Sequence, residues 1–520
     1  MAYIPLRKIG SGGIVTDQDP YDLELTQFPA GNNVQFHDGR IGKALGHTLT
    51  TALPVAPTHI QGWRYSGNNT LVIGTLNNIY RFNGSAVTNV TKTSNSTNYS
   101  NSPRWQSEQL GFAMMFNNGA DTPQFMYPTG SRFADLPNWP SAVTSKCIKP
   151  YKSFLIMAGY ETSGTQHPYT VRWSDEYDPS SVPTSYDIAS TTNLAGSNTL
   201  SGNNGELIDQ MTLNNSQLIY AENGVFAMDF IGAPFVFSFR EVFSDDGIIN
   251  RGAVASFFNK HLVVGNNDIY VHDGNQKESI VDKRVGRTFF NELGDTRSVF
   301  CHTIDERSEV WICYADNDAV DQLTANRALV YNWTQNAFTF VDLPNTRALT
   351  DSDVINTDGA WQNISATETY ANTSKYWSTS SLNTQSKGVG VFAVGPVENK
   401  VYRLNDSHAS EGAVLNSYLE ATKIDLDVVL GKSNNAIKQI VSILPQIEGQ
   451  GTCNISIGTS DAPQAGVSWK TPITYDIESD HKIDVRASGR YFALRIESAN
   501  SADYWRLTGL DIDVSEVSGR

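Results

Sequence analysis

Short apolar runs separated by turn residues follow one another along most of the chain, and helical periodicity is almost absent. The runs are rich in Val, Ile, Phe, Tyr and Trp, and Asn, Gly, Asp or Pro stand at their ends, as at residues 70–74, 153–157 and 309–314. Such runs are typical of strands joined by tight turns. The pattern predicts an all-β protein.

One strand-and-turn unit recurs along the chain. Residues 78–84 (NIYRFNG) match residues 268–274 (DIYVHDG), and residues 400–406 and 223–229 are weaker copies. Asn, Asp and Gly tolerate positive φ, so each copy reads as part of a β-hairpin. Hairpins repeated at such intervals predict a β-propeller, with a sandwich or a β-helix as the alternatives. At about 45 residues a blade, residues 46–410 would hold six to eight blades.

The remaining parts of the chain differ from this repeat. Two stretches rich in polar residues, near 160–215 and 343–388, are expected to be loop insertions. Residues 411–520 contain apolar residues at every second position, which predicts a C-terminal antiparallel β-sandwich. Residues 1–45 have many turn residues and little periodicity, so they are expected to form an N-terminal arm.

Charge and composition exclude several classes of protein. The 38 Lys and Arg residues against 54 Asp and Glu give a net charge of −16, which argues against tight binding to nucleic acid. No apolar run approaches the length of a membrane span, and the first residues lack the apolar region of a secretory signal. The four cysteines form no CxxC pair. We therefore expect a soluble chain made in a reducing cytosol, with no disulfide framework.

Motifs for catalysis, metal binding or nucleotide binding are missing from the sequence. There is no HExxH, no GxxxxGK[ST], no strand-linked GxGxxG and no GxSxG. We therefore predict no catalytic residues, no metal site and no cofactor. The acidic run at residues 316–321 (DNDAVD) lacks the Gly and the distal Glu of a calcium loop, so a solvated turn is the favoured interpretation.

The opening of the chain carries a distinctive motif at residues 28–43 (FPAGNNVQFHDGRIGK), with Gly46 beyond it. This motif resembles the opening of the tail nozzle, or packaged-DNA stabilisation, proteins of short-tailed bacteriophages. Residues 489–492 (GRYF) and 505–509 (WRLTG) look like the ending that such proteins often carry. The resemblance covers the two ends of the chain, about 80 residues, while the middle agrees only in kind.

The resemblance implies a structural role in the virion tail, after assembly in the host cytoplasm. A homo-oligomeric ring, six-fold in this family, would extend the DNA channel below the tail adaptor protein, beside the tail fibres or tailspikes. It would hold back the packaged genome and let duplex DNA pass without specific binding. An acidic lumen would suit this role because Lys and Arg contacts to phosphate would slow the duplex, although net charge alone does not assign the residues that line the channel.

The arm is the part of the sequence best suited to assembly. Val34 and Phe36 alternate with polar neighbours as in an edge strand, and Asp38-Gly39 should form a tight turn. Such an arm could add a strand to a neighbouring subunit, or it could pack on its own propeller. For the first case we predict an oligomer interface at Phe28, Asn33, Phe36 and Arg40.

A propeller-type glycan hydrolase or a receptor-binding tail protein is the alternative function. Its mark would be a cluster of Arg and carboxylate side chains in the central pocket of the propeller. Arginines are present in many of the expected strands and turns, and nothing in the sequence places three of them together; they include Arg64, Arg81, Arg172, Arg240 and Arg403. A calcium-dependent adhesion protein is a third option, based only on residues 316–321.

Overall fold

The computed structural model describes residues 2–65, 68–92, 99–101, 104–200, 202–353, 390–427 and 436–518. Strands make up 55% of the structure and helices 4%, which confirms the all-β prediction. Within these described ranges, none of the helices is long and apolar enough to cross a membrane. All four cysteines are free thiols.

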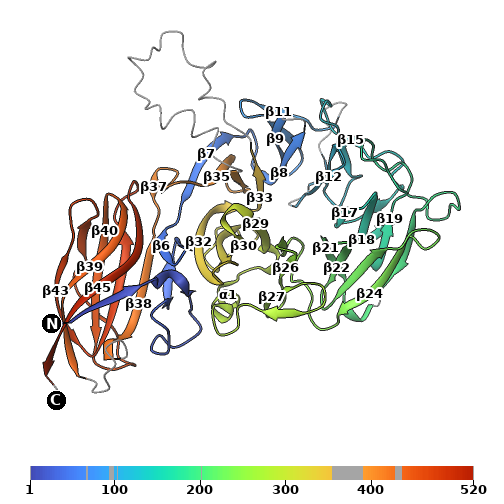
Figure 1. The fold of residues 1–520 in the computed structure, drawn as a ribbon. Coiled ribbons are helices and arrows are strands. Elements are labelled where there is room, and N and C mark those ends of the chain that lie inside the picture. The colour runs from blue at the N-terminus through green and yellow to red at the C-terminus, as the bar shows by residue number, and fades with distance from the viewer. Residues whose placement is uncertain are drawn as a thin grey trace, which may run out of the picture.

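Seven antiparallel sheets of four or five strands follow one another along the described part of the chain (Figure 1). The first contains β8 (Pro57–Tyr65), β9 (Asn68–Thr75), β10 (Ile79–Phe82) and β11 (Val87–Asn89). The second contains β12 (Gln106–Leu110), β13 (Ala113–Asn117), β14 (Gln124–Met126) and β15 (Ala134–Asp135). The third contains β16 (Val143–Thr144), β17 (Ile148–Tyr151), β18 (Phe154–Thr162), β19 (Thr165–Trp173) and β20 (Gly196–Thr199).

The next four sheets continue the series. The fourth contains β21 (Leu207–Leu213), β22 (Ser216–Ala221), β23 (Val225–Phe230) and β24 (Phe237–Phe243). The fifth contains β25 (Val254–Phe257), β26 (Lys260–Val264), β27 (Ile269–His272) and β28 (Lys277–Ser279). The sixth contains β29 (Phe300–Ile304), β30 (Glu309–Tyr314), β31 (Ala325–Asn332) and β32 (Ala337–Thr346). The seventh contains β33 (Ala348–Ser352), β34 (Gly390–Val394), β35 (Lys400–Ser407) and, from far earlier in the chain, β7 (Gly46–Ala52).

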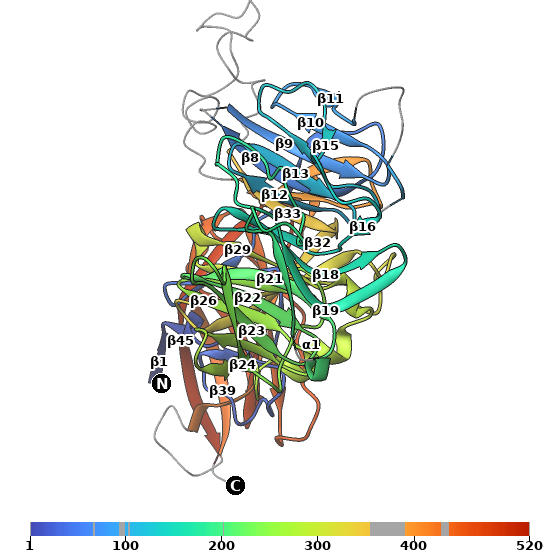
Figure 2. The ribbon, with the colours of Figure 1, turned by 90° about the vertical axis from the view of Figure 1, so that its right-hand side faces the viewer.

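These sheets are arranged in a cycle, which we call the cyclic array. The strands β8, β12, β17, β21, β25, β29 and β33, here called the first strands, each lie beside the next one in this order, and β33 lies beside β8. Figure 2 shows the first and second sheets above the third and fourth. The second or third strands, such as β13, β30 and β34, are buried along their whole length, as expected for β-branched and aromatic runs packed between sheets.

The four copies of the sequence repeat occupy the same position in their sheets. They contain β10, β23, β27 and β35, and each of these is the third strand of its sheet. In the copies at residues 78–84 and 268–274, Asn78 and Asp268 end the turn from the second strand to the third, and Asn83 and Asp273 begin the turn from the third strand to the fourth. The prediction that these copies are equivalent hairpin units is confirmed.

Two further sheets, here called the terminal sheets, lie at one side of the cyclic array (Figure 1). One contains β43 (Ile483–Gly489), β39 (Ile437–Gln450), β45 (Tyr504–Ser518), β6 (Arg40–Lys43), β5 (Val34–His37) and β1 (Ala2–Arg7). The other contains β4 (Ala30–Asn32), β38 (Tyr418–Asp425), β44 (Tyr491–Ser498), β40 (Thr452–Ser460), β41 (Ser468–Trp469) and β42 (Ile473–Asp476). Buried side chains of both sheets, such as Ile443 and Phe492, belong to one apolar cluster.

Short elements complete the described structure. They are the parallel pair β2 (Gly13–Ile14) and β3 (Gln27–Phe28), the pair β36 (Ala409–Ser410) and β37 (Ala413–Val414), the helix α1 (Gly286–Glu292), and the 3-10 turns η1 (Ile9–Ser11), η2 (Gly202–Asn204), η3 (Thr296–Ser298) and η4 (Asp305–Arg307). Asp17 caps α1, because its carboxylate accepts hydrogen bonds from the backbone N–H groups of Arg287 and Thr288 at 2.6 and 3.1 Å. This cap ties the arm to the cyclic array.

The segments expected outside the repeat take specific places. Residues 1–45 contribute β1, β4, β5 and β6 to the terminal sheets instead of extending as a separate arm. Within residues 160–215, residues 160–173 form the end of the β18–β19 hairpin, and β20 and β21 follow later in the segment. Irregular chain is therefore confined largely to residues 174–195. In the segment 343–388, residues 343–352 lie mostly in β32 and β33, and residues from 354 on lie outside the described ones.

Asn33 is the point at which the chain crosses from one terminal sheet to the other. It stands between β4 and β5 with φ of 51° and is fully buried. Its side-chain Nδ2 donates to Asp342 Oδ2 at 2.6 Å and to the Asn416 carbonyl at 2.8 Å, and its Oδ1 accepts from the Asp342 N–H at 2.8 Å. Because Asp342 belongs to β32, Asn33 joins both terminal sheets to the cyclic array.

Replacing Asn33 tests this joint. We expect Asn33→Ala to lower the free energy of unfolding by about 3 kcal/mol, through lost buried hydrogen bonds and a left-handed backbone that alanine disfavours. Asn33→Gly loses the same hydrogen bonds but accepts positive φ, so it should be less destabilising by about 1 kcal/mol. Urea unfolding of both variants measures the difference, and equal values would contradict a backbone requirement at this position.

Candidate functional site

Polar side chains from the first strands and the residues just before them meet at the centre of the cyclic array. They line a cavity of about 190 Å³. Those that can carry charge are His59, Arg104, Glu108, Lys149, Asp209, Arg251 and Arg347. These residues come from six different sheets, so only the cyclic arrangement brings them together.

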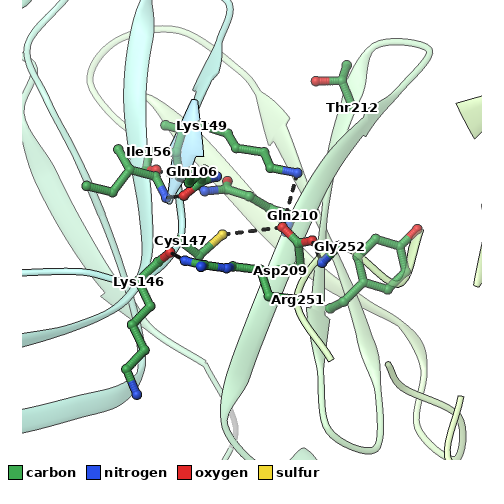
Figure 3. Close-up of polar contacts among 12 residues, drawn as sticks. Gln106, Lys146, Cys147, Lys149, Ile156, Asp209, Gln210, Thr212, Arg251 and Gly252 are labelled. Atoms are coloured by element: carbon green, nitrogen blue, oxygen red, sulfur yellow. Dashed lines mark hydrogen bonds and ion pairs between the residues drawn. The ribbon is translucent and has the colours of Figure 1, made fainter. Parts of the chain in front are cut away.

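Asp209, on β21, is the most completely enclosed carboxylate of this site. Figure 3 shows the side chains of Lys149 and Cys147 directed at it. Lys149 Nζ lies 3.1 Å from Asp209 Oδ1. The backbone N–H groups of Gly252 and Gln210 also donate to this carboxylate, each at 2.8 Å. Asp209 is thus held by donors from three sheets.

The ion pair determines the charge state of both partners. Burial disfavours the charged carboxylate of Asp209, but Lys149 and the two backbone donors outweigh it and lower the pKa. Burial likewise disfavours the charged ammonium of Lys149, but Asp209 and Glu108 outweigh it and raise its pKa. Burial raises the pKa of the Cys147 thiol, whose Sγ lies 3.5 Å from Asp209 Oδ1. Cys147 is therefore a protonated donor and not a nucleophile.

Glu108, on β12, lines the same cavity, but its pKa is shifted in the opposite direction to that of Asp209. Its burial raises its pKa to about 7, with Asp209 adding to the shift and Lys149 opposing it. A carboxyl group that titrates near neutrality beside an ionised carboxylate is the arrangement used in acid–base chemistry. Asp209, however, is already occupied by an ion pair and two backbone donors, so it is positioned to hold the sheets together and not to attack a substrate.

Three arginines lie around the cavity. Arg104 stands just before β12, Arg251 shortly before β25 and Arg347 just before β33. Burial, together with the charges of Arg251 and Arg347, lowers the pKa of Arg104 to about 9. Arg251 donates to the backbone carbonyls of Lys146 and Arg104. The guanidinium groups are thus close enough to repel one another.

His59, on β8, closes the hydrogen-bonded wall of the cavity. Its Nε2 lies 2.7 Å from Ser107 Oγ, and that hydroxyl donates to Gln61 Oε1 at 3.0 Å. Since Ser107 donates to Gln61, it accepts from His59, which places the ring proton on Nε2. Burial, together with Arg251 and Arg104, lowers the pKa of His59 to about 3. The ring is therefore neutral at physiological pH.

A second buried polar chain lies between the fourth and fifth sheets. The Tyr220 hydroxyl is 2.6 Å from His261 Nδ1 and 3.0 Å from His272 Nε2. His261 Nε2 donates to the Thr212 carbonyl at 3.1 Å, and His272 Nδ1 accepts from the Gly274 N–H at 3.2 Å. Every proton of this relay has one position, with both rings neutral. Burial lowers the pKa of His261 to about 3 and that of His272 to about 4.

Of the four residues predicted for an oligomer interface, three are buried and one is exposed. Phe28, Asn33 and Phe36 are buried within the chain, and the two phenylalanine rings are 6.1 Å apart. β5 is an edge strand, as expected, with the Asp38-Gly39 turn after it, but β32 of the same chain lies beside that edge. This matches the alternative in which the arm packs on its own chain. Arg40 is exposed and lies 3.5 Å from Glu448.

The acidic run at residues 316–321 forms a hydrogen-bonded turn. Asp316 accepts from the Asp318 N–H at 2.9 Å, and Asp321 accepts from Thr324 Oγ1 at 2.6 Å and pairs with Arg347 at 2.8 Å. Over the described residues, no group of three or more His, Cys, Asp or Glu side chains could hold a metal ion.

The arginines named from the sequence are not the ones that gather. Arg64, Arg81, Arg172, Arg240 and Arg403 do not line the central cavity, whereas Arg104, Arg251 and Arg347 do. A signal was present: each of these three residues precedes the first strand of its sheet. This position could have predicted the arginine cluster only if the first strand of each sheet had been identified from the sequence.

No family model matches this chain, and no curated protein matches it either.

The neutral buried histidines predict acid sensitivity. Because His59, His261 and His272 have lowered pKa values in the folded chain, the unfolded chain binds more protons below pH 6.5. Stability is therefore complete above pH 6.5 and decreases as the pH falls towards 4, by up to about 1.4 kcal/mol per pH unit for each histidine.

Urea unfolding between pH 7.5 and 4.5 measures this loss. We expect His261→Gln to be less stable than the unmodified chain at pH 7.5 but to lose less stability on acidification. His481→Gln, which removes an exposed histidine, is the matched control and should follow the unmodified chain. Parallel pH profiles for all three would contradict the assignment of neutral buried rings.

Proposed function

We propose that this chain is a structural tail protein of a short-tailed phage, a nozzle subunit. It assembles into a homo-oligomeric, six-fold ring that extends the DNA channel below the adaptor. The ring retains the packaged genome and lets duplex DNA pass at ejection. It contacts the adaptor and the tail fibres or tailspikes, and it performs no catalysis.

The architecture that goes with this function is a seven-bladed β-propeller beside a β-sandwich. Seven sheets in cyclic contact, with β33 beside β8, support the propeller, and β7 would close it by pairing with β35. Two six-stranded antiparallel sheets that share one apolar cluster support the sandwich. In this description the seven sheets are the blades, within the six to eight expected from the repeat.

The observation that carries the proposal is the place of the opening motif. Within the motif that resembles the nozzle family, Asn33 joins the two halves of the molecule, and Gly39 and Lys43 position β5 and β6 in the terminal sheets. Asn33 bonds to β32, and Gly39 forms the β5–β6 turn with φ of 71°. Lys43 is fully buried, with Nζ donating to the Asp503 carbonyl at 2.8 Å. The motif therefore specifies how the halves are oriented, a property that a ring subunit must keep constant.

The charge of the molecule supports the same role. A net charge of −16 permits a lumen lined by carboxylates, which would repel duplex DNA and not retard its passage. The cations of the cavity described above are partly buried and come from one chain. A conduit that does not bind DNA is consistent with both features.

Native mass spectrometry and electron microscopy test the ring directly. We expect the purified chain, alone or with the adaptor, to form a closed ring with an opening wide enough for duplex DNA. A monomer or trimer that persists after addition of the tail components would contradict the proposal.

Arg40 provides a sharper test of the interface. It pairs with Glu448 on the surface of the same chain, and both side chains are exposed, so this pair contributes about 0.5 kcal/mol or less to folding. We expect Arg40→Glu to weaken ring assembly at least tenfold while the melting temperature stays nearly constant. The matched control is Glu448→Arg combined with Arg40→Glu, which restores the pair in reversed order.

If the reversed pair assembles normally, Arg40 acts only through Glu448 and is an internal brace. If assembly stays weak, Arg40 contacts a neighbouring subunit.

A receptor-binding tail protein or glycan hydrolase is the second candidate. One observation favours it: Arg104, Arg251 and Arg347 line a central cavity together with Glu108 and Asp209, the feature expected of that class. Because Asp209 is fully engaged by Lys149 and backbone donors, we expect no release of reducing sugar from host polysaccharide. If reducing sugar is released by the unmodified chain and not by Glu108→Gln, the protein is a glycan hydrolase and the structural proposal is wrong.

A further inference from the structure

An exposed apolar loop lies between β23 and β24 in the fourth sheet. Residues 230–235 (FIGAPF) contain no polar side chain, and this loop is here called the apolar tip. Phe235 is 75% exposed, Ile231 56% and Phe230 46%. Consecutive apolar residues that face water lower solubility, so a run of this length indicates a binding surface.

The apolar tip is supported by the chain beneath it. The Phe230 ring lies 5.9 Å from the Phe154 ring and 5.8 Å from the Phe237 ring. The Ile231 N–H donates to the Val236 carbonyl at 3.0 Å and closes the loop. A loop that is already ordered loses little conformational entropy when it binds. The tip is therefore preorganised for a partner.

A cavity of about 180 Å³ lies between the two terminal sheets, and we call it the terminal cavity. Most of the residues that line it are apolar, with Ile443 and Ile512 from one sheet and Phe492 from the other. Tyr21 and Leu25 also line it and are 44% and 37% exposed, so the cavity reaches the surface. The atoms that line an apolar cavity lack contact partners, which lowers stability. An apolar side chain that enters it would supply these contacts.

The terminal cavity and Phe235 match in size and polarity. An apolar cavity of about 150 Å³ accepts one benzene ring, so a space of about 180 Å³ accepts the ring of one phenylalanine. β24, which follows the apolar tip, lies on the side of the cyclic array away from the terminal sheets (Figure 1). The tip therefore cannot reach the terminal cavity of its own chain.

We propose that Phe235 of one chain enters the terminal cavity of a second copy. Because the tip and the cavity lie at different places on the subunit, the contact is heterologous and can repeat from chain to chain. Such a contact produces a closed ring when the rotation between neighbours closes, and an open filament when it does not. The closed ring is the product expected here, which rests on the proposed nozzle function.

A second copy suits the apolar tip better than a lipid surface does. Segments that bind membranes combine apolar residues with Lys or Arg, which are attracted to anionic headgroups. Residues 230–239 contain neither Lys nor Arg, and Arg240 beyond them lies 3.5 Å from Asp229. The net charge of −16 also repels anionic lipid. These features favour an apolar protein surface, which the terminal cavity supplies.

Sedimentation velocity of the full chain over a concentration series tests the contact. We expect Phe235→Ser to raise the dissociation constant between subunits at least tenfold, because it removes a buried aromatic ring from the contact. Its melting temperature should stay nearly constant, since Phe235 is exposed in the single chain. Phe258→Ser removes a phenylalanine that is 83% exposed on the turn between β25 and β26. It is the matched control and should leave the dissociation constant unchanged.

Disulfide formation between two variants locates the contact. Phe235→Cys and Leu25→Cys are prepared separately in the full chain, mixed and oxidised. We expect a disulfide-linked pair of chains in the mixture and not in either variant alone. A mixture of Phe258→Cys and Leu25→Cys is the control and should remain unlinked.

An unchanged dissociation constant in Phe235→Ser, equal weakening by Phe258→Ser, or absence of the linked pair would overturn the proposal. A ring that forms normally in Phe235→Ser would leave the nozzle proposal intact, so the two failures are distinct. Filaments that Phe235→Ser disperses would support the contact and contradict the closed ring. An unmodified chain that stays monomeric and unlinked would overturn both. If that monomer, and not Phe235→Ser, binds vesicles of phosphatidylethanolamine and phosphatidylglycerol, the tip contacts a membrane instead.

Discussion

The pairing of the beginning of the chain with its end is the constraint on which the rest of the structure depends. β1 and β6 are paired with β45, β4 is paired with β38, and β7 is paired with β35, while β5 joins its sheet through β6. None of these sheets is complete until residues from both ends are present. Long-range pairings of this kind are slow to form because a large loop must close first. In the folded chain they leave fewer open sheet edges, which limits aggregation.

The centre of the cyclic array is polar. Strands that enter from seven sheets bring their first residues to one centre, where Asp209 is held by Lys149 and two backbone N–H groups. Removing one partner of such a buried pair is strongly destabilising, since the other charge is left unpaired. The centre therefore combines an ion pair, one neutral histidine and three arginines.

The joint at Asn33 links that interior to the terminal sheets. A left-handed, fully buried asparagine with three side-chain hydrogen bonds can be replaced by few residues. A subunit of a closed ring needs its parts at a constant angle, because errors in angle accumulate around the ring. A rigid joint between the two halves is the structural property most relevant to the proposed nozzle.

Local patterns in the sequence determined the all-β class, the equivalence of the repeat copies and the Asp38-Gly39 turn. These depend on side-chain alternation and on residues that accept positive φ, which act over a few positions. The edge strand at Val34 and Phe36 was predicted and is β5, whereas β1, β4 and β6 were not, because their pairing partners β45 and β38 lie near the other end of the chain. The cluster of Arg104, Arg251 and Arg347 was decided by the tertiary structure alone. Its members are far apart in sequence, and only the cyclic contact of the first strands places their charges around one cavity.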